Sequence, residues 1–131
     1  MGGAIFALMG AGHALLSVLD VLRPTQFTPT DDSVRLAMQA TDVRFTRGRA
    51  NMWNAWLGFN ISHGLGAFLF GAAVGWLGLS WGQVEVARLA LLLPVAIGLV
   101  YFVLSVRFWF YAPAVGSAVA TACFLAAWWA Y

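Results

Sequence analysis

The sequence predicts an all-α membrane protein, an up-down bundle of four transmembrane helices with an interfacial helix in a long first loop. Of the 131 residues 62% are hydrophobic and only 9% are charged, and the mean hydropathy is +0.81. Such a chain cannot cover itself with a charged surface, so lipid must be its main solvent. At about 20 residues per crossing, the length allows four helices and one sizeable loop. We therefore expect residues 1–131 to form a single integral membrane domain.

The first crossing is predicted over residues 2–22. This stretch lacks the basic leader of a secretory signal, so we expect it to be retained. Polar and small residues recur along it at steps of three and four, at Gly10, His13, Ser17 and Asp20. The crossing ends at Arg23 and Pro24, and Asp20 is expected to pair with Arg23 one turn away.

The long first loop contains a predicted interfacial helix over residues 31–40. Thr30 and Asp31 precede a short amphipathic sequence, a pattern typical of an N-capped helix with acids in its first turn. Because its apolar side chains lie on one side, we expect it to rest on the membrane surface or to cap the bundle.

The second crossing, residues 51–78, carries polar side chains inside its apolar run at Asn60, Ser62 and His63. Small residues follow His63 at intervals of four, at Ala67, Gly71 and Gly75. The histidine therefore shares a narrow helical face that is typical of close helix packing.

The third crossing is predicted over residues 86–106, where Pro94 should bend the helix or leave a gap for a neighbour. The fourth, residues 113–131, contains Gly116 and Ala120 in a run of small residues suited to close packing. Together the small residues form three faces, more than four helices need for themselves. We therefore expect one face to meet a partner, so that Gly71→Leu would disturb association more than folding.

The arginines indicate the orientation of the chain. Loops one and three carry Arg23, Arg35, Arg44, Arg47, Arg49 and Arg107, whereas the other side carries only Arg88. The positive-inside rule then predicts that loops one and three are cytoplasmic and that both termini face outward, in a bacterial inner membrane.

A candidate site for a lipid head group lies where loop one enters the second crossing. It comprises Arg47, Arg49, Trp53, Asn54 and, on the same predicted side, Arg107. Arginines and amides can bind an anionic head group through paired hydrogen bonds. Simple positive-inside anchoring is the plainer interpretation of the same residues.

The two histidines are the main candidates for chemistry, because an ionisable side chain at mid-bilayer is costly. Antiparallel neighbouring helices would bring His13 and His63 to similar depth. In a structural interpretation, each imidazole hydrogen-bonds across a helix pair to Ser17, Asn60 or Ser62. In a functional one, both ligate a haem or chlorophyll-type pigment. A metal site is weaker, since no further ligands are fixed around one point.

The candidate ligand-binding residues are therefore His13, Asp20, Asn60, Ser62 and His63. The sequence has no GxSxG, HExxH, CxxC or phosphate-binding glycine loop. We predict a non-enzymatic accessory subunit or binder of a lipid-like molecule, in a homo-oligomer or larger membrane complex and without a nucleic-acid partner. The alternative is a small redox or enzyme unit that acts on a quinone or isoprenoid through His13 and His63.

The segment FTPTDD, followed by FTRGRANMWNAWLGFNISHGLG and an apolar second half, resembles a family of small bacterial four-helix integral membrane proteins. The resemblance covers Phe27 to Gly66 and implies an all-helical membrane fold. Because that family has no assigned activity, the resemblance implies no catalytic or binding residues.

Overall fold

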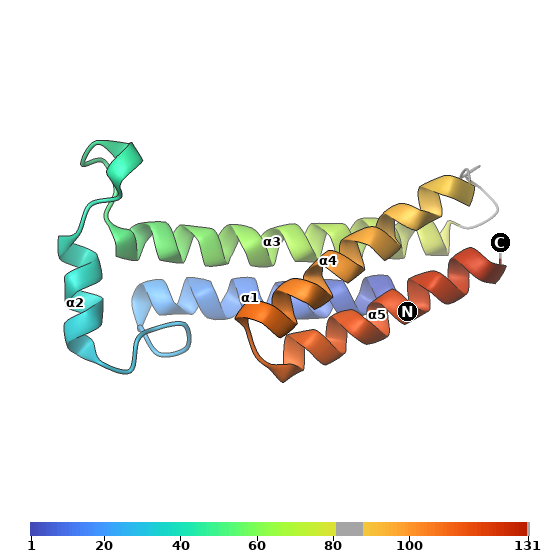
Figure 1. Cartoon of the computed structure of the whole chain (residues 1–131), viewed down its shortest axis with the longest axis horizontal. Coiled ribbons are helices and arrows are strands. Elements are labelled where there is room, and N and C mark those ends of the chain that lie inside the picture. Colours follow the sequence, from blue (N-terminus) through green and yellow to red (C-terminus); the bar gives the residue numbers. More distant parts are fainter. Residues whose placement is uncertain (81–87, 131) are drawn as a thin grey trace. The chain divides into compact units, whose positions relative to one another are not determined.

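The computed structural model of the chain describes residues 1–80 and 88–130, the side chain of Phe45 excepted. Helices make up most of this part of the chain. In order they are α1 (Gly2–Leu22), α2 (Asp32–Ala40), the 3₁₀ helix η1 (Arg44–Thr46), α3 (Met52–Leu79), the 3₁₀ helix η2 (Arg88–Leu91), α4 (Leu92–Phe108) and α5 (Tyr111–Ala130) (Figure 1).

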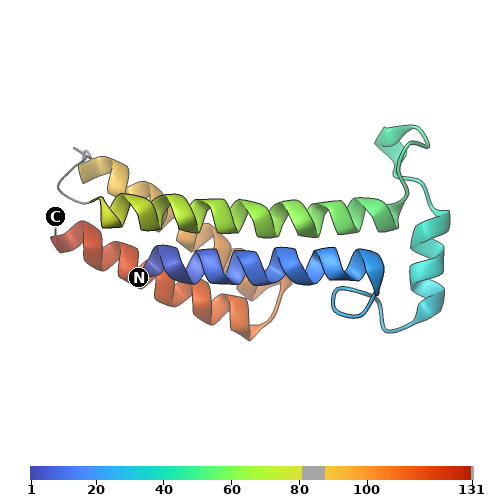
Figure 2. The same cartoon turned by 180° about the vertical axis from the view of Figure 1, so that it is seen from behind.

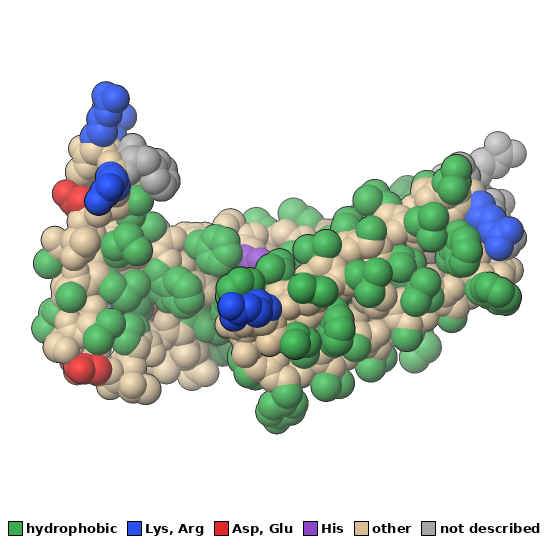
Figure 3. Space-filling view, in the orientation of Figure 1, with side chains coloured by type: hydrophobic (Ala, Val, Ile, Leu, Met, Phe, Trp, Pro, Cys, Tyr) green, Lys and Arg blue, Asp and Glu red, His purple; other side chains and the backbone are tan. Residues whose placement is uncertain are grey.

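Within residues 1–80 and 88–130, four segments are long and apolar enough to cross a membrane: Gly2–Leu22, Met52–Leu79, Arg88–Phe108 and Tyr111–Ala130. On the face drawn in Figure 3, hydrophobic side chains spread along the helices, and charged side chains are few. Helices with apolar surfaces all round need lipid or protein around them. The predicted class of an all-α, multi-pass membrane protein is therefore confirmed.

The chain divides into two compact units, and α1 and α3 each contribute to both. The apolar unit comprises Met1–Gly10 and Ala67–Tyr131, and the polar unit comprises Ala11–Gly66. The expectation of a single membrane domain stays a prediction. Residues 86, 87 and 131 of the predicted crossings lie outside the described residues.

The core of the apolar unit is an aromatic cluster around Phe6, which is 1% exposed. Its ring meets those of Phe70 and Tyr101 edge to face, with centroids 5.1 and 5.2 Å apart, and stacks on Phe124 at 6.1 Å. Such pairs contribute roughly 0.5 to 1.5 kcal/mol each beyond the area they bury. The cluster therefore joins the start of α1 to α3, α4 and α5.

Close backbone approach accompanies this cluster. A Cβ added at Gly71 would collide with the backbone of Gly3 and Ala7, and one added at Gly98 would collide with Thr121. Between helices in lipid the hydrophobic effect is absent, so such packing supplies much of the association free energy. The face that carries Gly71 is thus filled by α1 of the same chain.

Residues of α5 also pack inside the apolar unit. A Cβ at Gly116 would meet the side chain of Met9, while Ala120 and Ala67 are both buried in the core. Of the predicted packing residues, Ala67, Gly71, Gly116 and Ala120 therefore pack within the chain itself. The expectation that Gly71→Leu would act on association more than on folding is wrong, because its neighbours belong to α1.

Helix α4 begins at Leu92, directly after η2, so Pro94 lies in its first turn. The N–H groups of the first turn of an α-helix make no hydrogen bond within that helix, so a proline there removes none. Pro94 therefore follows the change from 3₁₀ to α geometry instead of bending the middle of a helix. Likewise, α5 begins at Tyr111, which places Pro113 in its first turn.

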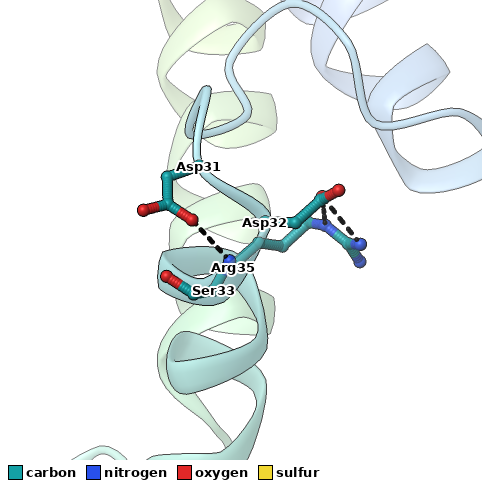
Figure 4. Close-up of polar contacts among 4 residues, drawn as sticks. All are labelled: Asp31, Asp32, Ser33 and Arg35. Carbon is teal, nitrogen blue, oxygen red and sulfur yellow. Dashed lines mark hydrogen bonds and ion pairs between the residues drawn. The ribbon is translucent and has the colours of Figure 1, made fainter.

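In the polar unit, α2 lies crosswise to the neighbouring ends of α1 and α3 (Figures 1 and 2). The predicted N-capped helix is present, and its N-cap is Asp31, whose Oδ1 accepts a hydrogen bond from the backbone N–H of Ser33 at 2.8 Å. Arg35 and Asp32 form an ion pair at 3.1 Å (Figure 4). No residue of α2 is buried, which suits a helix at a membrane surface.

Candidate functional site

The candidate site of the polar unit begins with Asp20, whose side chain is 0% exposed. Its Oδ1 accepts hydrogen bonds from the backbone N–H groups of Thr25 and Gln26, at 2.8 and 2.9 Å. Its Oδ2 accepts another from Phe27 at 2.6 Å. The predicted pair with Arg23 is therefore wrong, because the chain after the helix folds back and uses the carboxylate itself.

This fold-back places Phe27 against α1 and α3. Its carbonyl oxygen accepts a hydrogen bond from Trp56 Nε1 at 2.7 Å. Its ring lies against that of His13, with centroids 4.5 Å apart. Residues 23–26 stay exposed, but the half-buried Phe27 packs against both helices and covers one side of the imidazole.

His13 is held by Asn60, which is 0% exposed. The Nε2 atom of His13 lies 3.1 Å from Oδ1 of Asn60, and the Asn60 amide nitrogen donates to the carbonyl of Trp56 at 2.9 Å. Because the amide nitrogen is used as a donor, the oxygen is the acceptor, and His13 carries its proton on Nε2. Ser17 donates from its hydroxyl to the backbone carbonyl of His13.

The two histidines lie next to each other. Their ring centroids are 5.4 Å apart with the planes at 77°, and the ring of His63 stacks on Phe59 at 5.8 Å. A Cβ at Gly64 would collide with Ala14, which shows how closely α1 and α3 approach here. The polar unit therefore brings His13, Asn60 and His63 together.

Ser62 and Asp20 do not join this group. The hydroxyl of Ser62, an exposed residue, donates to the carbonyl of Phe59 in its own helix at 3.0 Å. Asp20 is engaged by the loop that follows α1. Of the sequence-predicted ligand-binding residues, three lie in contact and two are directed elsewhere.

A macrocycle ligated by both histidines would have to lie between their rings. Here the two rings meet edge to face and His13 Nε2 is hydrogen-bonded to Asn60. The arrangement therefore does not fit ligation of one haem or pigment by both. Among the described residues, no three His, Cys, Asp or Glu side chains are grouped so that they could hold a metal ion.

The predicted head-group residues differ in their environment. Trp53 is 5% exposed and belongs to the interior of the polar unit, whereas Arg47, Arg49 and Asn54 are exposed. Arg47 adopts a left-handed conformation with φ 53°, and Gly48 follows with φ 81°.

These two residues form the tip of a turn closed by a hydrogen bond from the backbone N–H of Val43 to the carbonyl of Ala50, 2.9 Å long. Arg107 belongs to the other unit, where its guanidinium lies 5.1 Å from the Phe108 ring centroid. The assignment of a lipid head group to this set stays a prediction.

The apolar unit contains a cavity that the sequence did not indicate. Its volume is about 720 Å³, and it lies where the start of α1, the end of α3, the start of α4 and the end of α5 meet. Its lining includes Phe70, Gly75, Pro94, Cys123 and Phe124. None of the described residues that line it carries a charged side chain.

Gly75 has a different role from the one its spacing predicts. Its backbone lies close to Gly3, but a Cβ on Gly75 itself would meet nothing within 4 Å. Gly75 therefore contributes open space to the cavity as well as a close contact to α1. A helical period of four can identify a small-residue face, but it cannot show whether a neighbour fills it.

Comparison of the chain with protein-family models, with curated proteins and with solved structures finds no match.

Proposed function

We propose that this chain is a non-enzymatic, multi-pass membrane protein that binds a lipid-like molecule in the cavity of the apolar unit. The observation that carries the proposal is the cavity itself, about 720 Å³ in volume and lined by apolar side chains and glycines. Pockets that bind small molecules typically measure roughly 300 to 1,000 Å³ and are lined mainly by hydrophobic and aromatic residues.

The shape of the cavity matters more than its hydrophobicity. A lipophilic ligand leaves one apolar solvent for another when it enters a protein from a bilayer, so burial from water contributes little. Affinity must come from dispersion contacts with fixed surfaces such as the rings of Phe70 and Phe124. A molecule with an apolar body that matches these walls is favoured over bulk acyl chains.

Filling the cavity tests the proposal. Gly75→Leu adds a side chain at a position where a Cβ meets nothing within 4 Å, so the helix can accept it while the cavity shrinks. Gly66→Leu is the matched control, because Gly66 lies in the same helix, is exposed and has equally open space. The measurement is the amount of lipophilic molecule that co-purifies in mild detergent, determined by mass spectrometry.

We expect Gly75→Leu to reduce the bound molecule by roughly tenfold or more, in line with the cost of overpacking a formed site. Gly66→Leu should retain it. If neither the original protein nor the control retains any lipophilic molecule, or if both variants retain it equally, the proposed function is wrong.

The proposal includes the orientation and surroundings expected from the sequence, with loops one and three in the cytoplasm of a bacterium. In a chain whose Cys123 is replaced by serine, a cysteine added in front of the exposed Met1 would react with a membrane-impermeant reagent on intact cells, whereas one placed at residue 40 would not. Any partner helix would pack on small residues that are open, such as Gly12, Gly58 and Gly66, where a Cβ meets nothing within 4 Å. Labelling at residue 40 alone would reverse the orientation.

A further inference from the structure

The end of α5 carries a buried donor without a partner. Nε1 of Trp128 is inaccessible to solvent and has no hydrogen-bond partner in the described part of the chain. A buried N–H that makes no hydrogen bond loses its interaction with water and gains nothing in return. Such a group commonly marks a place where a ligand or a water supplies the acceptor.

A cation lies against the same indole. The guanidinium carbon of Arg88 is 5.1 Å from the centroid of the Trp128 ring. Arg88 is an exposed residue and makes no ion pair with any acid in the described part of the chain. A guanidinium placed over a ring keeps its N–H donors, which lie in its own plane, available to an anion.

Arg88 and Trp128 do not line the cavity themselves, but each is a chain neighbour of residues that do. Arg88 begins η2, and Ala90 and Leu91 of the same short helix line the cavity. Trp128 lies in α5 directly after Ala127, another lining residue. The described residues of the wall have no charged side chain, whereas these two chain neighbours supply a cation and an N–H donor.

We infer that the molecule bound in the cavity is an anionic lipid. Its acyl part would occupy the apolar cavity, and its phosphate or carboxylate would accept hydrogen bonds from Arg88 and from Trp128 Nε1. This inference rests on the proposed function and adds the chemical class of the ligand. Arginine suits an anionic head group, because the N–H groups of its planar guanidinium can donate two parallel hydrogen bonds to phosphate or carboxylate oxygens.

The test measures binding of phosphatidylglycerol and phosphatidylcholine with matched acyl chains to the full-length protein in mild detergent, by native mass spectrometry. The variants are Arg88→Gln, which removes the cation, and Trp128→Phe, which keeps a ring but removes the N–H. Arg23→Gln controls for loss of one positive charge. Trp129→Phe controls for loss of a neighbouring, exposed indole.

The original protein should prefer phosphatidylglycerol by about tenfold, as expected for charge-assisted hydrogen bonds. Arg88→Gln and Trp128→Phe should each lose most of this preference while binding phosphatidylcholine as before. Both controls should keep it. Retained preference in Arg88→Gln, or its loss in Arg23→Gln to the same degree, would overturn the inference.

Two further outcomes separate this inference from the proposed function. Equal binding of both lipids, abolished by Gly75→Leu, would overturn the anionic head group and leave the lipid-binding function standing. Inorganic phosphate, added as a competitor, should displace phosphatidylglycerol only at far higher concentration, because it lacks the apolar part. Displacement at equal concentration would identify a site for free anions and overturn the lipid assignment.

Discussion

In the polar unit the largest fully buried side chains are those of Asn60 and Asp20, whereas in the apolar unit the largest is the ring of Phe6. The first two are fixed by directed hydrogen bonds from named donors and to named acceptors. Phe6 is fixed by ring contacts and by glycines that let backbones approach. The same two helices, α1 and α3, are therefore joined by two different kinds of interaction.

The two units should therefore differ in the kind of substitution that destabilises them most. Hydrogen bonds in a low-dielectric interior are strong, and an unpaired partner is costly. Packing contacts are individually weak but respond steeply to added volume, because a backbone cannot move away as a long side chain can. Adding volume should therefore damage the apolar unit most, and removing an acceptor should damage the polar unit most.

The largest expected effect is that of Gly71→Leu. The new side chain would meet the backbone of Gly3 and Ala7, so α1 and α3 must separate in the apolar unit. We expect the free energy of unfolding to fall by about 3 kcal/mol, measured by unfolding in mixed micelles followed by circular dichroism. Gly12→Leu, where a Cβ meets nothing within 4 Å, should change it by at most about 0.5 kcal/mol. Equal losses in both variants would contradict the comparison.

Removal of the Asp20 carboxylate should have the next largest effect. Asp20→Ala leaves the backbone N–H groups of Thr25, Gln26 and Phe27 without their acceptor. We expect a loss of about 2 kcal/mol, with faster hydrogen exchange at these three amides and unchanged exchange around Phe6. Asp20→Asn keeps one acceptor oxygen and should show a smaller change. Unaltered exchange at the three amides would show that the Asp20 carboxylate does not hold this loop in place.

The smallest expected effect is a pH dependence of α2. The Ser33 hydroxyl and its backbone N–H bind the Asp31 carboxylate and hold the pKa of that group below its ordinary value. A lowered pKa means that the cap stabilises α2 fully above the ordinary value of about 3.9. This stabilisation is lost as the pH falls below that value through the folded pKa.

The amide resonance of Ser33, followed by nuclear magnetic resonance, should therefore shift below about pH 4. In Asp31→Asn, which keeps a capping oxygen but does not ionise, the shift should disappear. A shift that persists in this variant would assign the titration to another acid.

Much of the fold follows from the sequence, since α1 begins and ends at the predicted residues 2 and 22, and α2 is an N-capped helix in the segment where one is predicted. Length, apolar content and capping residues are local properties, so the sequence displays them directly. The contact of His13 with Asn60 can also be predicted from the sequence, because both are polar groups inside apolar runs and each needs a partner.

Other features could not be predicted, for physical reasons. The partners of Asp20 are backbone N–H groups, which every residue but proline possesses, so no side chain marks them in the sequence. The sequence predicts Pro94 inside a crossing and not in the first turn of α4, because the change from 3₁₀ to α geometry before it has no signature in the sequence. The cavity beside Gly75 depends on space that several helices leave unfilled, which no single segment encodes.

The contacts of Phe6 also have a consequence for the order in which the protein is completed during synthesis. Asp20 finds its donors within the next seven residues, so that interaction can form as soon as the first loop leaves the ribosome. Phe6 finds Phe124 only when the last helix has been made. At a translation rate of about 5 to 20 residues per second, the ring of Phe6 therefore waits roughly ten seconds for Phe124, with only Phe70 and then Tyr101 made in the meantime.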